Sequence, residues 1–152
     1  QGLIDPFIIS WGKEVDPSAS SFIYENQYQG TRDFSPFLSV SSAINFQKNN
    51  DWDAIKEKCR ALTKQTLLIL RDILKTELLC PVNDDWLAQM ASIELPVKDR
   101  LKIKKTLLNN YKIEIPIFQW RGKNMLRFSF NAYNDKKDSN ILINAVEDIF
   151  SK

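Results

Sequence analysis

The sequence predicts an α+β fold, in which a small antiparallel sheet carries helices on one face. From residue 51 onward, the predicted elements follow the order helix, strand, helix, hairpin, helix. Apolar residues recur at three- and four-residue steps in the helical segments and alternate with polar residues in the strands. A turn signal, Arg121-Gly122-Lys123, joins the last two strands. We therefore expect one small α+β domain over residues 51–152.

The first 50 residues do not follow this order. The apolar run Pro6–Gly12 predicts a buried strand, and residues 13–35, which lack an apolar period, predict a long loop. Ser35 and Pro36 suit the N-cap and first turn of a helix that continues to Asn50. Its expected apolar side comprises Phe37, Val40, Ile44 and Phe46. Because a lone strand has no sheet to join, we expect its partner strands upstream, in a longer parent protein.

The segment after Asn50 predicts a long amphipathic helix. Asp51 is expected to cap it, and it should end near Leu79, before Pro81. Its apolar stripe comprises Trp52, Ile55, Cys59, Leu62, Thr66, Ile69 and Ile73. Alternation over residues 91–95 predicts a strand, and residues 98–111 predict a second helix. The residues that this helix should direct inward are Leu101, Leu107 and Leu108.

A hairpin and a helix complete the predicted domain. Isoleucines alternate with other residues over 113–117, which predicts a strand. Pro116 has no N–H to donate to a neighbouring strand, so we expect this strand at a sheet edge or bulged there. The returning strand is Met125–Asn131, and the last helix covers residues 135–150. Its expected apolar face comprises Ile141, Leu142, Ala145, Val146 and Ile149.

The returning strand contains the first candidate functional residue, Arg127. Alternation places Leu126, Phe128 and Phe130 on one face, toward the core. The opposite face comprises Met125, Arg127, Ser129 and Asn131. A guanidinium is well suited to a carboxylate, because its planar fork matches two oxygens. The pattern by itself favours a surface arginine paired with a nearby acid, because that is the more common case.

A second candidate lies in the predicted loop, at Tyr28–Asp33. Gly30 lets backbone N–H groups approach an anion, and Thr31 adds a hydroxyl donor, so a phosphate could bind there. A single glycine is a weak signal, and by itself it favours an ordinary turn over a phosphate site. The basic residues of 98–105 share their helix with leucines, which favours a solvated helix face over a nucleic-acid site.

Composition excludes several function classes. The chain has no histidine, which removes Ser-His-Asp and Cys-His catalysis and histidine metal sites. Cys59 and Cys80 are too few for a disulfide framework, and we expect buried free thiols. The net charge of +2 does not suggest nucleic acid, and no apolar run approaches membrane-spanning length. The sequence starts without Met or a signal peptide, so we expect part of a longer, cytoplasmic protein.

Five segments, in this order and spacing, resemble the isopenicillin N epimerase-like branch of the class V aminotransferase family. They are Pro6–Gly12, Gln29–Asp33, Ser41–Phe46, Tyr111–Pro116 and Leu126–Asn134, and the match covers nearly the whole chain. The resemblance implies a pyridoxal-phosphate (PLP) enzyme of the aspartate-aminotransferase type, fold type I, that works as a homodimer on an amino-acid substrate. Residues 1–50 would then be the end of the large PLP-binding domain, and residues 51–152 the C-terminal small domain.

The resemblance also implies roles for individual residues. Gly30 and Thr31 match a segment that contacts the PLP phosphate, typically across the dimer interface, and Arg127 matches the arginine that binds the substrate α-carboxylate. Arg32 would either order this loop or touch the phosphate. Tyr28 stands where many relatives have Trp. The lysine that holds the cofactor covalently would lie just upstream of Gln1, so we expect no catalytic residue in this chain and no activity from it alone.

Two alternatives to this enzyme hypothesis remain. Residues 51–152 could be a self-standing α+β module that binds a ligand or regulates, with Arg127 in a surface ion pair. Such a module would not need the N-terminal strand and the long loop. Nucleic-acid binding through the sheet is the weaker alternative, because Phe128 and Phe130 are expected in the core. The reaction type, whether transamination, epimerisation, desulfuration or cleavage, depends on residues outside the chain.

Overall fold

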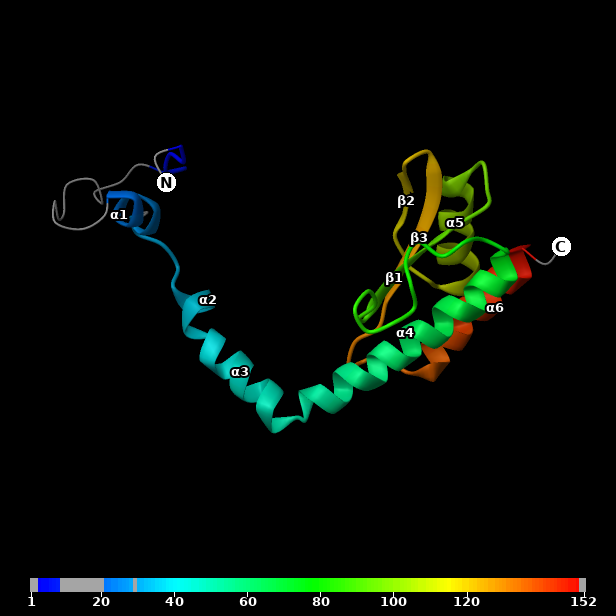
Figure 1. Cartoon of the computed structure of the whole chain (residues 1–152), viewed down its shortest axis with the longest axis horizontal. Helices are drawn as coiled ribbons and strands as arrows, with labels where there is room; N and C mark the ends of the chain where they lie inside the picture. Colours follow the sequence, from blue (N-terminus) through cyan, green and yellow to red (C-terminus); the bar gives the residue numbers. More distant parts are fainter. Residues whose placement is uncertain (1–2, 9–20, 29, 151–152) are drawn as a thin grey trace. The chain divides into compact units, whose positions relative to one another are not determined.

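The computed structural model describes residues 3–8, 21–28 and 30–150. They form two compact units, Gln1–Asn49 and Asn50–Lys152. The second unit contains a three-stranded antiparallel sheet in the order β1-β3-β2, together with helices (Figure 1). The predicted α+β class is therefore confirmed.

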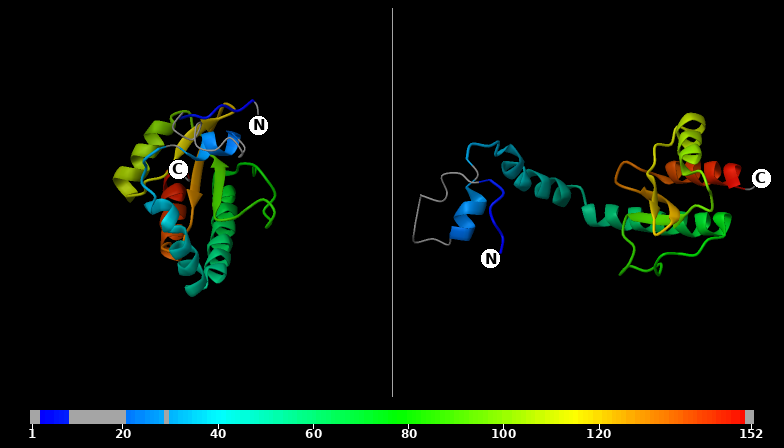
Figure 2. Two further views of the ribbon diagram at one scale, coloured as in Figure 1. Left: turned by 90° about the vertical axis from the view of Figure 1, so that its left-hand side faces the viewer. Right: turned by 90° about the horizontal axis from the view of Figure 1, so that it is seen from above.

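The second unit follows the predicted order of elements. These are α4 (Trp52–Leu74), β1 (Met90–Glu94), α5 (Arg100–Tyr111), β2 (Ile117–Trp120), β3 (Lys123–Ser129) and α6 (Lys136–Phe150). Helix α4 contacts both β1 and α6, and α5 contacts β2 and α6. Figure 2 shows the same layering from two further directions, with the helices along the sheet. The sheet therefore has one face covered by helices, and we call the other its open face.

The core lies between this sheet and the helices. On the strands it includes Ala91, Ile93, Leu126 and Phe128, which register places opposite one another in pairs. The buried residues that the helices contribute are Cys59, Thr63, Thr66, Leu67, Leu70, Leu74, Leu107, Ser139, Leu142, Ala145 and Val146. Cys59 is a buried free thiol as expected, whereas Cys80 is only partly buried.

Helix α4 begins after Asp51, as predicted, but its N-cap bond and its end differ from the prediction. Asp51 has a left-handed backbone (φ 48°) and makes no side-chain capping hydrogen bond. The helix ends at Leu74, because Lys75 adopts φ 53° and donates its N–H to the Arg71 carbonyl at 2.8 Å. The expected end near Leu79 was wrong, since lysine gives no sequence signal for a left-handed C-cap.

The inward faces of α5 and α6 also differ from the prediction at several leucine and isoleucine positions. Leu101, Leu108 and Ile141 are exposed. On α5 the inward residues instead recur every four positions, at Ile103, Leu107 and Tyr111. The basic residues of this helix lie around the exposed leucines, on the side away from the core.

The two hairpin strands lie closer to the turn than predicted, and the returning strand is Lys123–Ser129 where Met125–Asn131 was expected. The first strand begins at Ile117 and not at Ile113, while the alternation of buried and exposed side chains starts earlier, as predicted. β2 is an edge strand, as Pro116 required. Arg121 and Gly122 both have positive φ, at 47° and 78°, which is the two-residue type I′ turn that suits the twist of paired strands.

In the described part of the first unit, the helices are α1 (Ser21–Gln27), α2 (Ser35–Leu38) and α3 (Val40–Asn49). Helix α1 lies within the segment predicted as a loop, so that prediction was wrong there. Phe34, not Ser35, is the N-cap of α2, and the Ser35 N–H is bound by the Asp33 carboxylate at 2.9 Å. Residues 6–8 of the predicted first strand are not in a strand, and residues 9–12 lie outside the described part of the chain. The apolar residues of α2 and α3 are exposed.

Candidate functional site

Arg127 lies on the central strand β3, on the open face of the sheet. Leu126, Phe128 and Phe130 are buried on the helix side, as predicted. Met125 lies on the open face with Arg127, as predicted, but it is fully buried there, outside the core cluster. Its direct neighbours are Phe118 and Glu94, whereas Arg127 lies opposite the small Ser92. Smaller neighbours leave the Arg127 side chain exposed.

The Arg127 guanidinium is available for an anion. Its central carbon lies 5.9 Å from the centroid of the Phe118 ring, so the aromatic face supports the cation. Among the residues that the structure describes, no carboxylate forms an ion pair with Arg127. Because no described acid occupies the N–H donors of this guanidinium, they can bind the two oxygens of a carboxylate from a ligand.

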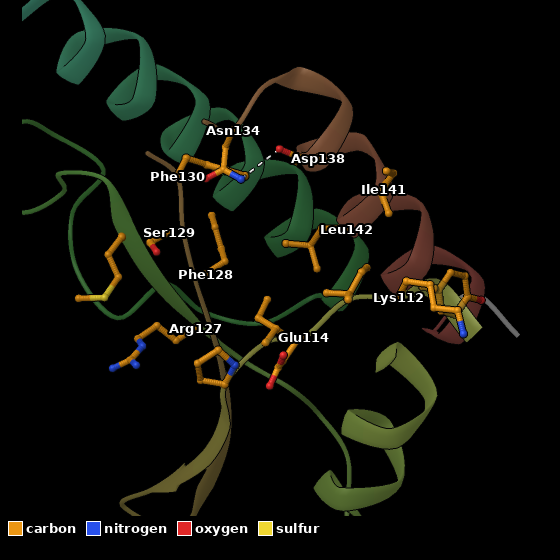
Figure 3. Close-up of a pocket in the computed structure, with 15 residues that line it drawn as sticks. Lys112, Glu114, Arg127, Phe128, Ser129, Phe130, Asn134, Asp138, Ile141 and Leu142 are labelled. Atoms are coloured by element: carbon orange, nitrogen blue, oxygen red, sulfur yellow. Dashed lines mark hydrogen bonds between the residues drawn. The ribbon is translucent and has the colours of Figure 1, made fainter. Parts of the chain in front are cut away.

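Arg127 lines a groove of about 530 Å³ (Figure 3). The groove lies where the chain before β2 separates from β3, and α6 borders its far side. Figure 3 shows Arg127 pointing away from Phe128 and Leu142, on the other side of the strand. Its lining residues are Met90, Tyr111, Lys112, Ile113, Glu114, Ile115, Pro116, Arg127, Phe128, Ser129, Phe130, Asn134, Asp138, Ile141 and Leu142.

Pro116 determines where the groove opens. The Arg127 N–H donates to the Pro116 carbonyl at 3.0 Å, which continues the hydrogen-bonding pattern between β2 and β3 by one bond. The return bond cannot form, because proline has no N–H to give to the Arg127 carbonyl. Pairing therefore stops beside Arg127, and the edge of β3 near Ser129 faces the groove.

Most other charges of the groove already have partners within the fold. The Asp138 carboxylate accepts hydrogen bonds from the Asn134 amide at 3.0 Å and the Asp135 backbone at 3.1 Å. The Lys112 ammonium donates to the Asn109 carbonyl at 2.9 Å. Arg127 and Glu114 are the charged side chains of the groove for which the described residues supply neither an ion pair nor a side-chain hydrogen bond.

Gly30 and Thr31 line a separate hollow in the first unit, with a volume of about 800 Å³. Gly30 has φ +83°, a conformation that glycine adopts without strain. The Arg32 guanidinium lies over two rings, 5.2 Å from Phe34 and 4.8 Å from Phe37. The other lining residues are Tyr24, Gln27 and Tyr28.

Asp33 orders this loop. Its carboxylate accepts the Ser35 N–H, and hydrogen bonding to Ser35 holds the pKa of Asp33 below its ordinary value. A glycine with freely approachable backbone, a threonine hydroxyl and a guanidinium suit a phosphate group in their chemistry. This hollow lies in the first unit, and the groove of Arg127 lies in the second.

Sequence reasoning missed Met90 and Phe118 as neighbours of Arg127. The alternation that buried Ala91 and Ile93 already placed Met90 on the opposite face, but the register that brings β1 beside β3 was not predictable from either strand alone.

Within the described ranges, no cluster of three or more acidic or thiol side chains could bind a metal ion. None of the described helices combines the length and apolar character that crossing a membrane demands.

Comparison with known proteins identifies relatives over most of the chain. No family model matches it. It is 26% identical to isopenicillin N epimerase of Amycolatopsis lactamdurans, over 97% of this chain and 40% of that protein. The corresponding epimerase of Streptomyces clavuligerus is 28% identical over 78% of this chain and 30% of the relative. The probable chloroplastic L-cysteine desulfhydrase of Arabidopsis thaliana is 30% identical over 80% of this chain and 29% of its own length.

The structure also resembles 8-amino-7-oxononanoate synthase from Francisella tularensis, with a TM-score of 0.55. The two chains are 20% identical, and the match covers 86% of this chain and 36% of the synthase, so it informs on the fold alone. The chain thus spans 40% or less of the curated relatives described above. The resemblance predicted from the five sequence segments is confirmed.

Proposed function

We propose, from this similarity to isopenicillin N epimerases, that the chain is the C-terminal part of a PLP-dependent enzyme that acts on an amino acid. The relatives support PLP as the cofactor of the parent protein. When bound, PLP supplies the electron sink for chemistry at the α-carbon of an amino acid. The contribution of this chain is binding and orientation: Arg127 holds the substrate α-carboxylate, and Gly30 and Thr31 contact the cofactor phosphate.

The observation that carries the proposal is the state of Arg127. Arg127 lines a groove with its side chain exposed, its guanidinium lies 5.9 Å from the Phe118 ring centroid, and no described acid forms an ion pair with it. A structural surface arginine would be expected to pair with an acid on its own or the neighbouring strand. The unpaired Arg127 guanidinium, beside the edge of β3 that β2 leaves unpaired, instead fits a small carboxylate ligand. It can bind both carboxylate oxygens with two parallel hydrogen bonds.

The test uses the 152-residue chain and two ligands that differ only in the carboxylate. L-alanine and L-alaninamide are titrated while backbone amide signals are followed by NMR. We expect L-alanine to shift the signals of residues 127–129, and L-alaninamide to shift them much less. Arg127→Gln should abolish the difference, whereas Arg121→Gln should retain it. Arg121 is a matched control, because it also stacks on an aromatic ring, 4.7 Å from Trp120, but lies at the hairpin turn. Equal shifts by both ligands would contradict the role of Arg127.

The phosphate role of Gly30 and Thr31 is tested separately, with inorganic phosphate as the probe. Phosphate should shift their amide signals, and Thr31→Val should weaken binding by about tenfold, the value of one hydrogen bond to a charged group. Thr106→Val is the control, because the Thr106 hydroxyl bonds only the Lys102 carbonyl within α5. Phosphate binding that is unchanged in Thr31→Val would overturn this assignment.

We further propose that the chain alone is inactive. The support is the resemblance, which implies a lysine outside this chain as the covalent anchor of the cofactor. The same resemblance supports a homodimeric, cytoplasmic parent. Incubation of the chain with PLP and an amino acid should give no turnover, and borohydride reduction should leave no single lysine stoichiometrically labelled. Turnover by the isolated chain would contradict this proposal.

A self-standing binding module is the second candidate function. The observation that favours it is that residues 50–152 form a compact unit whose core cluster lies between Cys59 and Val146. Expression of residues 50–152 alone separates the two candidates. A module should bind its ligand as tightly as the full 152-residue chain does, and it should gain no activity when the rest of the parent is supplied.

A further inference from the structure

Met90 lies beside Arg127 on the open face, and the strand register shows how close the two are. Met90 is opposite Ser129, and Ser92 is opposite Arg127. The backbone of Phe130 bonds Gln89 at 2.9 Å, and the backbone of Leu95 bonds Asn124 at 2.8 Å, so these are the hydrogen-bonded pairs. The pairs of Met90 and Arg127 alternate with them and are therefore non-hydrogen-bonded.

Side chains in non-hydrogen-bonded pairs approach one another most closely. Met90 and Arg127 are diagonal neighbours across two such pairs, a spacing of roughly 7–8 Å between backbones that long side chains bridge. The two residues between them are serines, Ser92 and Ser129. Two long side chains separated by small ones leave a space on the open face, with a cation on one side and a thioether on the other.

Met90 is 53% exposed and lines the same groove as Arg127. A methionine side chain is flexible and polarisable, which suits contact with varied apolar groups. Its exposure leaves apolar area in water that a ligand could cover. The open-face positions opposite and beside it are Ser92, Arg127 and Ser129, and the unpaired acid of the groove, Glu114, lies on the chain before β2 and not on these strands.

We propose that Met90 contacts the hydrocarbon side chain of the ligand whose carboxylate Arg127 holds, so that the site favours amino acids with apolar side chains. The proposal rests on the proposed function, because it uses Arg127 as the carboxylate ligand. Once the guanidinium binds both oxygens, the carbon chain of the ligand extends across the space above Ser129. Met90 is the apolar group that it meets there.

A series of straight-chain carboxylates tests this inference on the 152-residue chain. Acetate, propionate, butyrate and valerate are titrated as sodium salts at constant ionic strength, with the amide signals of residues 127–129 as readout. We expect Kd to fall by about two- to fourfold for each added methylene, as apolar burial on the order of 0.8 kcal/mol per methylene implies at most. Met90→Ala should flatten this dependence and leave the Kd of acetate unchanged, and Met90→Leu should retain it.

The outcomes separate the two proposals. If acetate produces no shift at residues 127–129, or if Arg127→Gln binds acetate as well as the wild type, the proposed function fails and the inference fails with it. If acetate binds through Arg127 but Kd does not change with chain length, the inference alone is wrong. It is also wrong if Met90→Ala retains the full dependence. Met90 is exposed, so circular dichroism should show that both variants fold as the wild type does.

Discussion

The hydroxyl oxygens of Thr66 on α4 and Ser139 on α6 lie 2.7 Å apart inside the core. Thr66 donates its only hydroxyl hydrogen to the Leu62 carbonyl at 2.7 Å, so Ser139 is the donor between the two hydroxyls. Thr66 is 0% and Ser139 3% exposed, which leaves water no access to either group. This bond fixes the two helices against each other on the covered side of the sheet that presents Arg127.

Thr66→Val should destabilise the chain by about 1–3 kcal/mol, because it leaves the buried Ser139 hydroxyl without an acceptor. Urea unfolding followed by circular dichroism measures the change. The double variant Thr66→Val with Ser139→Ala removes both partners and should recover most of the loss. If the double variant is as unstable as the sum of the two single variants, the hydroxyl pair does not couple the helices.

Asp84 should make stability depend on acid pH. Its hydrogen bond from Lys64, followed by the charges of Lys64 and Arg60, holds its pKa below the ordinary value of 3.8. A lowered folded-state pKa gives stability that is present above the unfolded pKa and is lost as pH falls through the folded pKa. Asp84→Asn should therefore lower Tm near neutral pH, and the difference from wild type should shrink in strong acid.

The control for Asp84→Asn is Asp85→Asn, the adjacent exposed carboxylate, whose neutralisation should change Tm little at any pH. Because Asp84 is fully exposed, the expected effect is small and screened by salt. A Tm difference that stays constant from acid to neutral pH would show that the variant acts on packing of the loop and not on the ion pair.

Gly122→Ala should destabilise the hairpin by about 1–2 kcal/mol, the cost of a left-handed backbone for a residue with a side chain. Gly122 has φ +78°, and nothing lies within 4 Å of the position of an added methyl group, so backbone strain is the sole cause. Arg121→Asn changes the other turn residue to one that accepts positive φ and should not lower Tm. Equal stability of Gly122→Ala and wild type would contradict the type I′ turn.

Local patterns predicted much of the fold. Alternation placed Leu126 and Phe128 in the core and Arg127 outside it, because period two in a strand needs no knowledge of its neighbours. The burial of Met125 was not predictable for the same reason, since its direct neighbours Phe118 and Glu94 lie on the two other strands. The end of α4 at Lys75 was not predictable, because the left-handed C-cap position holds a lysine where sequence rules expect a glycine.

The candidate site could be predicted one residue at a time but not as an arrangement. Arg127 was identifiable from its strand, whereas Met90 becomes its neighbour only through the pairing of segments more than thirty residues apart. Register depends on the total packing of both strands and on their connections, which no short window of sequence contains. The roles of Gly30 and Thr31 rest on the resemblance and remain predictions.

Pro116→Ala should extend the pairing of β2 with β3 by one residue. The Pro116 carbonyl already accepts the Arg127 N–H at 3.0 Å, so the two residues are aligned and lack only the return donor. The substitution supplies an N–H that can donate to the Arg127 carbonyl, and hydrogen exchange at position 116 should be slow. Overall stability should change little, because the added bond and the greater freedom of the unfolded chain oppose each other.

Pro96→Ala is the matched control, because Pro96 is also exposed and lies just beyond Leu95, past the end of β1. The amide introduced there has no strand beside it and should exchange quickly. Since the groove beside Arg127 exists only because pairing stops at Pro116, slow exchange at 116 should be accompanied by weaker carboxylate binding at residues 127–129. Fast exchange at both positions would mean that some other feature of the chain before β2 keeps the edge of β3 open.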